Sequence, residues 1–289
     1  MATLPAADIR RAVRQGLEED LGQGDTTTSA LFSCPVPARA RIIAQQSLVV
    51  AGMAAAVQCF LAVDPSARLA VVKKDGTSAN TGDELLRIEG DGRSILMAER
   101  VALNFLQHLS GIATLTHRFC QTVRGYPVTI LDTRKTVPGW RALQKWAVAL
   151  GGGTNHRRSL GDGVLIKDNH LRLLPTGDPV REACRRARTS TKRPIIVEVE
   201  SLKEVRDALA AQADIILLDN MTPAMVRKAV RLIKNRALVE ASGGVTLNNV
   251  RAMAAAGPDR ISIGALTHSA PAATISLELE PIRKRDKRP

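Results

Sequence analysis

In the second half of the chain, short apolar runs each end in residues that can bind anions or metal ions. Arginine and lysine donate hydrogen bonds to carboxylates and phosphates, and carboxylates bind hard cations. Glycine-rich turns let backbone amides approach a phosphate closely. If the runs are parallel strands of one sheet, their ends share one edge, and these residues converge on one site. The residues that follow the runs are Thr133, Arg134, Lys135, Lys167, Glu198, Asp219, Ser242, Gly243, Gly244 and Gly264.

A triple glycine at 151–153 precedes His156 and Arg157. The missing side chains let the backbone approach a ligand or take a positive φ, although a loop that ends a helix is the alternative. Arg157 is suited to bind a carboxylate or phosphate through two parallel hydrogen bonds. His156 is the histidine best placed for the same site, whereas His108 and His117 fall in a helical stretch and are expected to be structural. His170 and His268 fit either role.

Ser242, Gly243 and Gly244 stand between an apolar run and a helix expected to start near residue 246. Their amides and the helix N-terminus could together hold a phosphate. Gly264 follows the next run, and barrel enzymes often bind phosphate at their last two loops. A simple tight turn is the alternative at each place. Because two such turns end consecutive runs, a phosphate site is favoured.

Glu198 and Asp219 end successive runs and suit Mg²⁺, which takes one or two protein carboxylates together with substrate oxygens. Salt bridges to nearby lysines and arginines are the alternative. Lys167 alone at a run end would also suit an aldolase that forms a Schiff base. Because Lys135 and Arg157 are expected in the same site, neutralisation of the charge of several anionic groups is favoured instead.

The elements that must position these residues alternate between strand and helix, which is typical of a parallel sheet. A doubly wound sheet and a barrel both fit this alternation. Functional residues at the end of nearly every run favour the barrel, and about six strands favour an incomplete one. Strands are expected at 128–131, 164–166, 195–199, 215–218, 237–240 and 261–263, with helices at 140–150, 202–211, 223–234 and 247–256.

The first part of the chain has a different pattern. A helix is expected at 6–21, followed by a loop at 22–29, and short β-like runs then surround an alanine-rich helix at 53–61. This combination predicts a small domain of packed α and β layers. A helical stretch at 94–123 links it to the barrel. We expect domains at 1–112 and 113–270, with a C-terminal segment at 271–289 that ends in a solvated basic tail.

Composition narrows the classes of partner. Lysine and arginine number 41 against 28 acidic residues, so anionic partners are favoured. Nucleic acid is the alternative partner, but only 2% of the residues are aromatic, which leaves little for stacking bases. The four cysteines form no CxxC pair, so a zinc site is not indicated. The chain has no apolar leader, and its longest apolar stretch is short for a bilayer, so we expect a cytoplasmic protein without membrane contact.

The chain resembles the quinolinate phosphoribosyltransferase family. The matching stretches follow one another in order along nearly the whole chain. They are EDLGQGDTTT (19–28), ERVALNFLQHLSGIATLT (99–116), DTRKTVPGWR (132–141), GGGTNHR (151–157), LIKDNH (165–170), VEVE (197–200), ILLDNM (216–221), EASGG (240–244) and ISIGALTHS (261–269).

The resemblance implies an N-terminal α/β sandwich, an incomplete parallel α/β barrel, and a homodimer with shared active sites that could assemble further. It implies transfer of the phosphoribosyl group from 5-phosphoribosyl 1-diphosphate to quinolinate. The products would be nicotinate mononucleotide, diphosphate and carbon dioxide, as in de novo NAD biosynthesis. A homologue with the same donor site and a different acceptor is the alternative.

The resemblance also implies roles for individual residues. Arg100 would reach into the partner subunit's pocket, and Lys135, Lys167, Glu198 and Asp219 would be catalytic. Substrate contacts would come from Thr133, Arg134, Lys135, His156, Arg157 and Lys167, ribose and Mg²⁺ contacts from Glu198 and Asp219, and 5′-phosphate contacts from Ser242, Gly243, Gly244 and Gly264. The chain departs from the common family pattern at Trp140, Gln144, Trp146 and Ser159.

Overall fold

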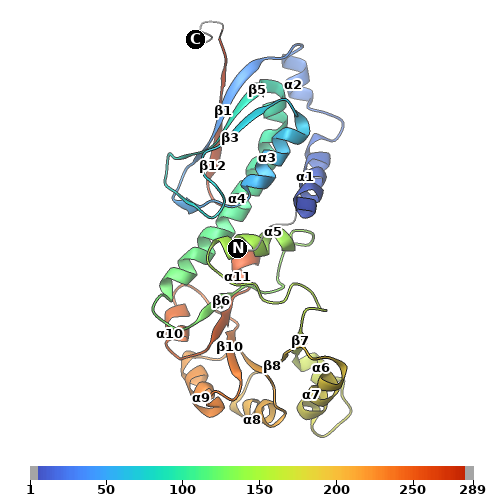
Figure 1. The fold of residues 1–289 in the computed structure, drawn as a ribbon, viewed down its shortest axis with the longest axis vertical. Helices are drawn as coiled ribbons and strands as arrows, with labels where there is room; N and C mark the ends of the chain where they lie inside the picture. Colours follow the sequence, from blue (N-terminus) through green and yellow to red (C-terminus); the bar gives the residue numbers. More distant parts are fainter. Residues whose placement is uncertain (1–5, 284–289) are drawn as a thin grey trace. The chain divides into compact units, whose positions relative to one another are not determined.

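The computed structural model describes residues 6–283, and Figure 1 shows its helices and strands. The chain divides into two compact units. Among the described residues, the first unit comprises 6–117, 137–152 and 270–283, and the second comprises 118–136 and 153–269. The basic tail lies outside the described residues except for Arg283, which is exposed. In the described part of the chain, no helix is long and apolar enough to span a membrane.

The first unit contains a four-stranded antiparallel sheet in the order β12-β1-β5-β3. Along β1, alternate residues such as Ala40 and Ile42 are buried while Arg39 and Arg41 are exposed, as expected for a strand with one wet face. Arg39 pairs with Glu89 on β5 across that face. The strands are β1 (Pro37–Ala44), β3 (Arg68–Val71), β5 (Glu84–Asp91) and β12 (Ile275–Pro281), and β2 (Leu48–Val49) pairs with β4 (Ser78–Ala79).

The helices of the first unit follow the apolar spacing of the sequence. Helix α1 (Ala6–Leu21) buries Ile9, Val13 and Leu17 on one face, as predicted. The expected loop at 22–29 is wrong in part, because Asp25 accepts a hydrogen bond from the amide of Thr28 and caps a short helix, α2 (Thr26–Leu31). The other helices are α3 (Met53–Val63), α5 (Arg141–Leu150) and the long α4 (Gly92–Thr122), which ends in the second unit.

Two departures from the family pattern belong to one cluster in the first unit. The ring of Trp140 stacks on Phe105 at 4.6 Å between centroids, and its edge meets His108. Gln144 is fully buried, accepts a hydrogen bond from the amide of Val137 at 3.0 Å and lies 2.7 Å from Nε2 of His108. His108 is therefore a structural residue of this cluster, as the sequence predicted.

The second unit is built on a six-stranded parallel sheet in the order β6-β11-β10-β9-β8-β7. Strands β7 to β11 lie side by side in chain order, without the reversal of a doubly wound sheet. They continue in one direction as in a barrel that is open between β6 and β7. The expected α/β fold class is therefore confirmed. The strands are β6 (Thr129–Leu131), β7 (Val164–Ile166), β8 (Ile195–Val199), β9 (Ile215–Asp219), β10 (Leu238–Ser242) and β11 (Arg260–Ser262).

Helices connect these strands, and side chains cap several of them. Ser201 and Thr222 each accept a hydrogen bond from an amide in the first turn of the helix that follows. The helix expected at 247–256 is shorter than predicted. The helices are α6 (Asp168–Arg172), α7 (Pro179–Ser190), α8 (Leu202–Ala210), α9 (Pro223–Ile233), α10 (Val250–Ala254) and α11 (Ala265–His268).

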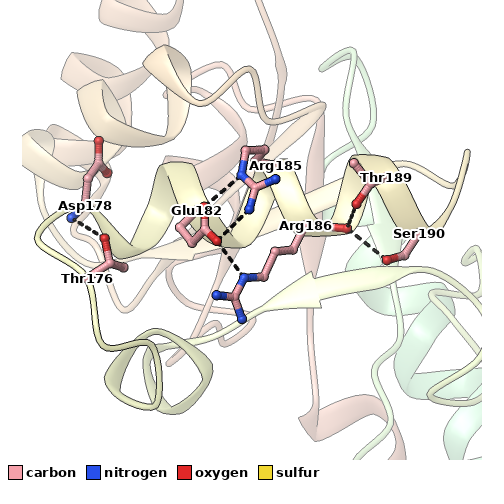
Figure 2. A network of polar contacts seen from close by, with 7 residues as sticks. All are labelled: Thr176, Asp178, Glu182, Arg185, Arg186, Thr189 and Ser190. Carbon is pink, nitrogen blue, oxygen red and sulfur yellow. Dashed lines mark hydrogen bonds and ion pairs between the residues drawn. The ribbon is translucent and has the colours of Figure 1, made fainter.

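Helix α7 carries four arginines, and acidic residues on the helix and beside it neutralise much of that charge. Glu182 accepts hydrogen bonds from Arg185 and Arg186, as Figure 2 shows. The two arginines, Arg185 first, hold the pKa of the Glu182 carboxyl at about 2. Asp214 pairs in the same way with Arg188 at 2.8 Å. This helix is therefore not a free cationic surface of the kind that a nucleic-acid-binding protein presents.

Candidate active site

A cavity of about 560 Å³ opens in the second unit at the carboxyl ends of the strands. It is lined by twelve of the thirteen residues that the sequence nominated. The thirteenth, Arg100, is exposed on α4 in the first unit and does not line it. The twelve are Thr133, Arg134, Lys135, His156, Arg157, Lys167, Glu198, Asp219, Ser242, Gly243, Gly244 and Gly264.

One buried carboxylate joins the two loops that carry most of the cations. Asp132, at the end of β6, is fully buried. It accepts hydrogen bonds at 2.8 Å from the side-chain amide of Asn155 and from the backbone amide of His156. Thr154 reinforces the connection, because its amide donates to the carbonyl of Ile130 at 2.8 Å. The loop after β6 and the loop after the glycines at 151–153 are thus held side by side.

Arg134 and Arg157, on these two loops, lack anionic partners among the described residues. Nε of Arg134 is buried and has no hydrogen-bond partner there. Burial lowers the pKa of the Arg157 guanidinium, and the positive charge of Arg134 lowers it further, while Glu198 opposes both. Since uncompensated charge in a cavity is costly, this arrangement suits a ligand that brings its own carboxylate or phosphate.

Lys167 and Glu198 pair with each other inside the cavity. Nζ of Lys167 donates to Oε2 of Glu198 at 2.5 Å, across strands β7 and β8. The amide of Lys167 donates to Nδ1 of His170 at 3.0 Å, so His170 stabilises the start of α6. His170 does not line the cavity, whereas His268 does. The sequence left the roles of both histidines open.

The glycine turn after β10 is closely packed against the end of β9. Gly243 has φ +86°, and a Cβ atom there would lie only 2.2 Å from Oδ1 of Asn220. The amide of Asn220 donates to the carbonyl of Ser242 at 2.9 Å. Only glycine fits at residue 243, and the turn presents its backbone to the cavity.

The expectation that a helix N-terminus near 246 adds to this turn is wrong. Oδ1 of Asn249 accepts from the amide of Thr246 at 2.8 Å, and its amide group donates to the carbonyl of Gly244. These bonds hold 246–249 as a turn, so α10 begins only at Val250. The amides that could bind a phosphate therefore belong to the turn itself. Gly264 also lines the cavity, at the start of α11, and follows β11, which pairs with β10.

The sequence reasoning missed Glu240 and Ser262, which also line the cavity. Glu240 lies in the middle of β10, is fully buried, and has Oε1 at 3.4 Å from Nε2 of His156. An acidic residue inside an apolar run was the available signal for it. Ser262 gave no such signal, since a serine at a strand end is common.

Together these features define an enzyme site of the α/β-barrel type for substrates that carry phosphate and carboxylate groups. The comparisons with known proteins narrow this class. Residues 25–110 match the model of the quinolinate phosphoribosyl transferase N-terminal domain, and residues 112–278 match that of the C-terminal domain. The chain belongs to the quinolinate phosphoribosyl transferase family, which confirms the resemblance seen in the sequence.

Individual relatives agree along almost the full length. The chain is 39% identical to the probable nicotinate-nucleotide pyrophosphorylase [carboxylating] of Bacillus subtilis, over 94% of this chain and 93% of the relative. It is 40% identical to the similarly named protein of Methanocaldococcus jannaschii, over 93% and 96%. A solved nicotinate-nucleotide pyrophosphorylase from Francisella tularensis superposes with a TM-score of 0.91 at 34% identity, over 96% and 98%.

Proposed function

We propose that this chain transfers the phosphoribosyl group of 5-phosphoribosyl 1-diphosphate to the ring nitrogen of quinolinate. The products are diphosphate, carbon dioxide and nicotinate mononucleotide, an intermediate of de novo NAD biosynthesis. The relatives bear the names of this activity. The observation that carries the proposal is one cavity that combines arginines without anionic partners among the described residues with a glycine turn open to a phosphate.

The acceptor is assigned to the arginine side of the cavity. Quinolinate carries two adjacent carboxylates, and a guanidinium can bind a carboxylate through two parallel hydrogen bonds. Arg134 and Arg157 supply two such groups, and Thr133 adds a hydroxyl on the same loop. Binding of the carboxylates satisfies the buried Nε of Arg134, which lacks a partner among residues 6–283.

The donor is assigned to the glycine side. Ser242, Gly243 and Gly244 present backbone amides, and Gly264 lines the same cavity, with the side chains of Lys135 and His268 packed where its Cβ would lie. Asp219 lies at the end of β9, next to Ser242 in the strand register, where it can accept hydrogen bonds from ribose hydroxyls. The ribosyl carbon would then lie between the two halves of the cavity.

The carboxylates of Glu198 and Asp219 fit a magnesium ion carried by the diphosphate. The described residues contain no cluster of three or more His, Cys, Asp or Glu side chains that could enclose a metal. Two carboxylates on adjacent strands suit Mg²⁺, which is usually shared between one or two carboxylates, substrate oxygens and water. When bound, the ion supplies positive charge to the diphosphate that leaves.

The lysines of the cavity stabilise charge during the reaction. Lys135 and Lys167 line the cavity, and we assign them to the negative charge that grows on the departing diphosphate, which is electrostatic catalysis without a covalent intermediate. The bond between the ribosyl carbon and the diphosphate oxygen breaks as the bond to the ring nitrogen forms. When the bond to the departing carbon dioxide breaks, its electron pair stays on the ring carbon, where the adjacent positively charged nitrogen stabilises it, and that carbon then takes a proton.

The assembly is proposed to be a homodimer, with Arg100 of each subunit completing the pocket of the other. Higher oligomers and the cytoplasmic location expected from the sequence stay predictions. A complementation experiment tests the shared site. Arg100→Ala and Arg157→Ala variants, each inactive alone, should recover part of the activity when they are mixed, because hybrid dimers contain one pocket with both arginines. No recovery after verified subunit exchange would rule out sharing.

The activity itself is tested by incubating the protein with quinolinate, the phosphoribosyl donor and MgCl₂, and following nicotinate mononucleotide. We expect product from the wild type and from Arg181→Ala, an exposed arginine on α7, but not from Arg157→Ala. Well-folded wild type that makes no product would refute the proposal. A panel with nicotinate and other pyridine carboxylates separates quinolinate from a different acceptor.

A further inference from the structure

Glu240 is a buried carboxylate that the substrate assignments above do not use. Its side chain is fully buried in β10, and neither carboxylate oxygen has a hydrogen-bond partner among the described residues. In the sheet, Leu217 pairs with both Glu240 and Glu198. Glu240 comes two residues before Ser242 on β10, so its side chain lies one layer further from the carboxyl end of the strand. Burying a carboxylate without a hydrogen-bond donor lowers the stability of the fold, so a role for Glu240 in the site is expected.

The nearest donor to Glu240 is the imidazole of His156. Nε2 of His156 lies 3.4 Å from Oε1 of Glu240, and the histidine side chain is only 10% exposed. On the other side of the ring, Nδ1 is 2.8 Å from the backbone amide of Arg157. The amide can only donate, so this contact favours the form of the ring in which Nδ1 accepts and carries no proton. The proton of a neutral ring is then on Nε2, which faces Glu240.

We propose that Glu240 is a positioning residue, which holds His156 as the Nε2–H tautomer by accepting that proton in a hydrogen bond. The ring in turn accepts the amide of Arg157 at Nδ1. Asp132 fixes the same turn from the other side through the amide of His156, at 2.8 Å. The two contacts of the His156 ring and the bond from its amide to Asp132 thus connect β10 to the backbone of Arg157, which is assigned to the anionic acceptor.

This role differs from a direct substrate contact by Glu240. A carboxylate that contacts the ribose or the acceptor would act on the substrates and would not set the tautomer of His156. A carboxylate that acts through His156 sets the tautomer in the protein without substrates. It then affects chiefly the affinity for the anionic acceptor, because the guanidinium of Arg157 depends on the turn that the ring supports. The effect on affinity for the acceptor rests on the proposed function, whereas the effect on the tautomer does not.

The tautomer is measured by two-dimensional ¹H–¹⁵N NMR of the imidazole rings at pH 8, without substrates. The chain has five histidines, so the spectrum is simple, and the His156→Asn variant identifies the signals of His156. We expect the Nε2–H tautomer in the wild type and in Glu240→Gln, whose amide oxygen can still accept. In Glu240→Leu we expect a mixture of tautomers. Glu182→Gln on α7, in the same unit, should leave the ring unchanged.

An Nδ1–H or doubly protonated ring in the wild type would overturn the proposal, whether or not Glu240→Leu folds. An unchanged ring in folded Glu240→Leu would overturn it as well. With active enzyme, Glu240→Leu should raise the KM for quinolinate about ten-fold and change kcat less than about three-fold, as expected for one lost positioning hydrogen bond. Glu240→Gln should have a KM for quinolinate close to that of the wild type. A fall in kcat with an unchanged KM would point to direct contact and against positioning.

If the wild type makes no nicotinate mononucleotide, the proposed function fails while the NMR result still decides the role of Glu240. If the wild type is active and the tautomer is wrong, the positioning role fails alone. The two results are therefore separable.

Discussion

The ammonium group of Lys167 lies 2.5 Å from the carboxylate of Glu198, so two residues assigned to the substrates are bound to each other in the protein alone. The lysine side chain is 44% exposed and the glutamate 14%. A pair this open to water contributes little to folding. In the proposed reaction, a diphosphate and its cation would separate the two charges that this geometry holds together.

The pair should therefore matter far more for activity than for stability. In a double-mutant cycle of Lys167→Met and Glu198→Gln, urea unfolding should give a coupling of about 1 kcal/mol or less. Each single variant should nevertheless lower kcat/KM at least about ten-fold, because each loses a group that acts on the donor. A large coupling free energy in urea unfolding, together with near-normal kcat/KM, would show that the pair stabilises the fold and does not act in the reaction.

Two neighbouring glycines should respond differently to alanine. At Gly243 a Cβ would collide with Asn220, whereas at Gly244, with φ +60°, it would meet nothing within 4 Å. Gly244→Ala should thus cost about 1 kcal/mol of left-handed strain, and Gly243→Ala about 2 kcal/mol more because the packing must shift. Urea unfolding measures both. The KM for the phosphoribosyl donor should rise more in Gly243→Ala, and equal effects would contradict the close packing of this turn.

Asp75 should make stability depend on pH. Its Oδ1 accepts the amide of Met53 at 2.9 Å at the start of α3, yet burial raises the pKa of the carboxyl to about 6. Because the folded pKa exceeds the unfolded value, stability should fall as pH rises from about 4 to 6. Asp75→Asn keeps the acceptor oxygen and should remove this fall. Thermal melting between pH 4 and 8 measures the effect.

Asp83 supplies a control of opposite sign. Hydrogen bonds from Asn80 and Lys73 lower the pKa of its exposed carboxyl, so its contribution is present at neutral pH and lost as pH falls. Asp83→Asn should therefore reduce melting temperature slightly at neutral pH and not at low pH. If both variants follow the wild-type pH curve, other groups set that curve.

Gln144→Glu, at a position where the chain departs from the common family pattern, should change the pKa of His108. Burial lowers the pKa of His108, so the native protein should lose stability as pH falls below about 6.5. A carboxylate at residue 144 would raise that pKa, so the variant should be most stable at low pH and lose stability as pH rises. The melting difference from wild type should narrow from pH 8 to 5.5. Gln45→Glu, an exposed residue, should show no such trend.

The strands of the second unit were predictable because each is a short apolar run that ends in polar residues. Val164–Ile166 and Ile195–Val199 have the predicted bounds. Helix α7 was missed because its mean character is strongly polar, with Cys184 and Val180 as its buried residues. Strand β12 was missed because one side of it is acidic and exposed, and only its pairing with β1 reveals it.

Most of the cavity was predictable from the resemblance and from the position of residues after the strands. The contacts between the residues of the site were not predictable. Nothing in the sequence shows that Asp132 joins the amides of two loops, or that Glu240 faces His156, because both depend on which strand ends meet. The domain boundaries expected at 112 and 270 stay a prediction.

The pairing of β12 with β1 also affects how the chain is made. Arg41 and Glu278, which are paired across these strands, are 237 residues apart. A ribosome that adds about 5–20 residues per second needs roughly ten to fifty seconds to span that distance. During this time the outer edge of β1 has no native partner and can recruit a strand from another chain. The first unit is thus the first to leave the ribosome and the last to be completed.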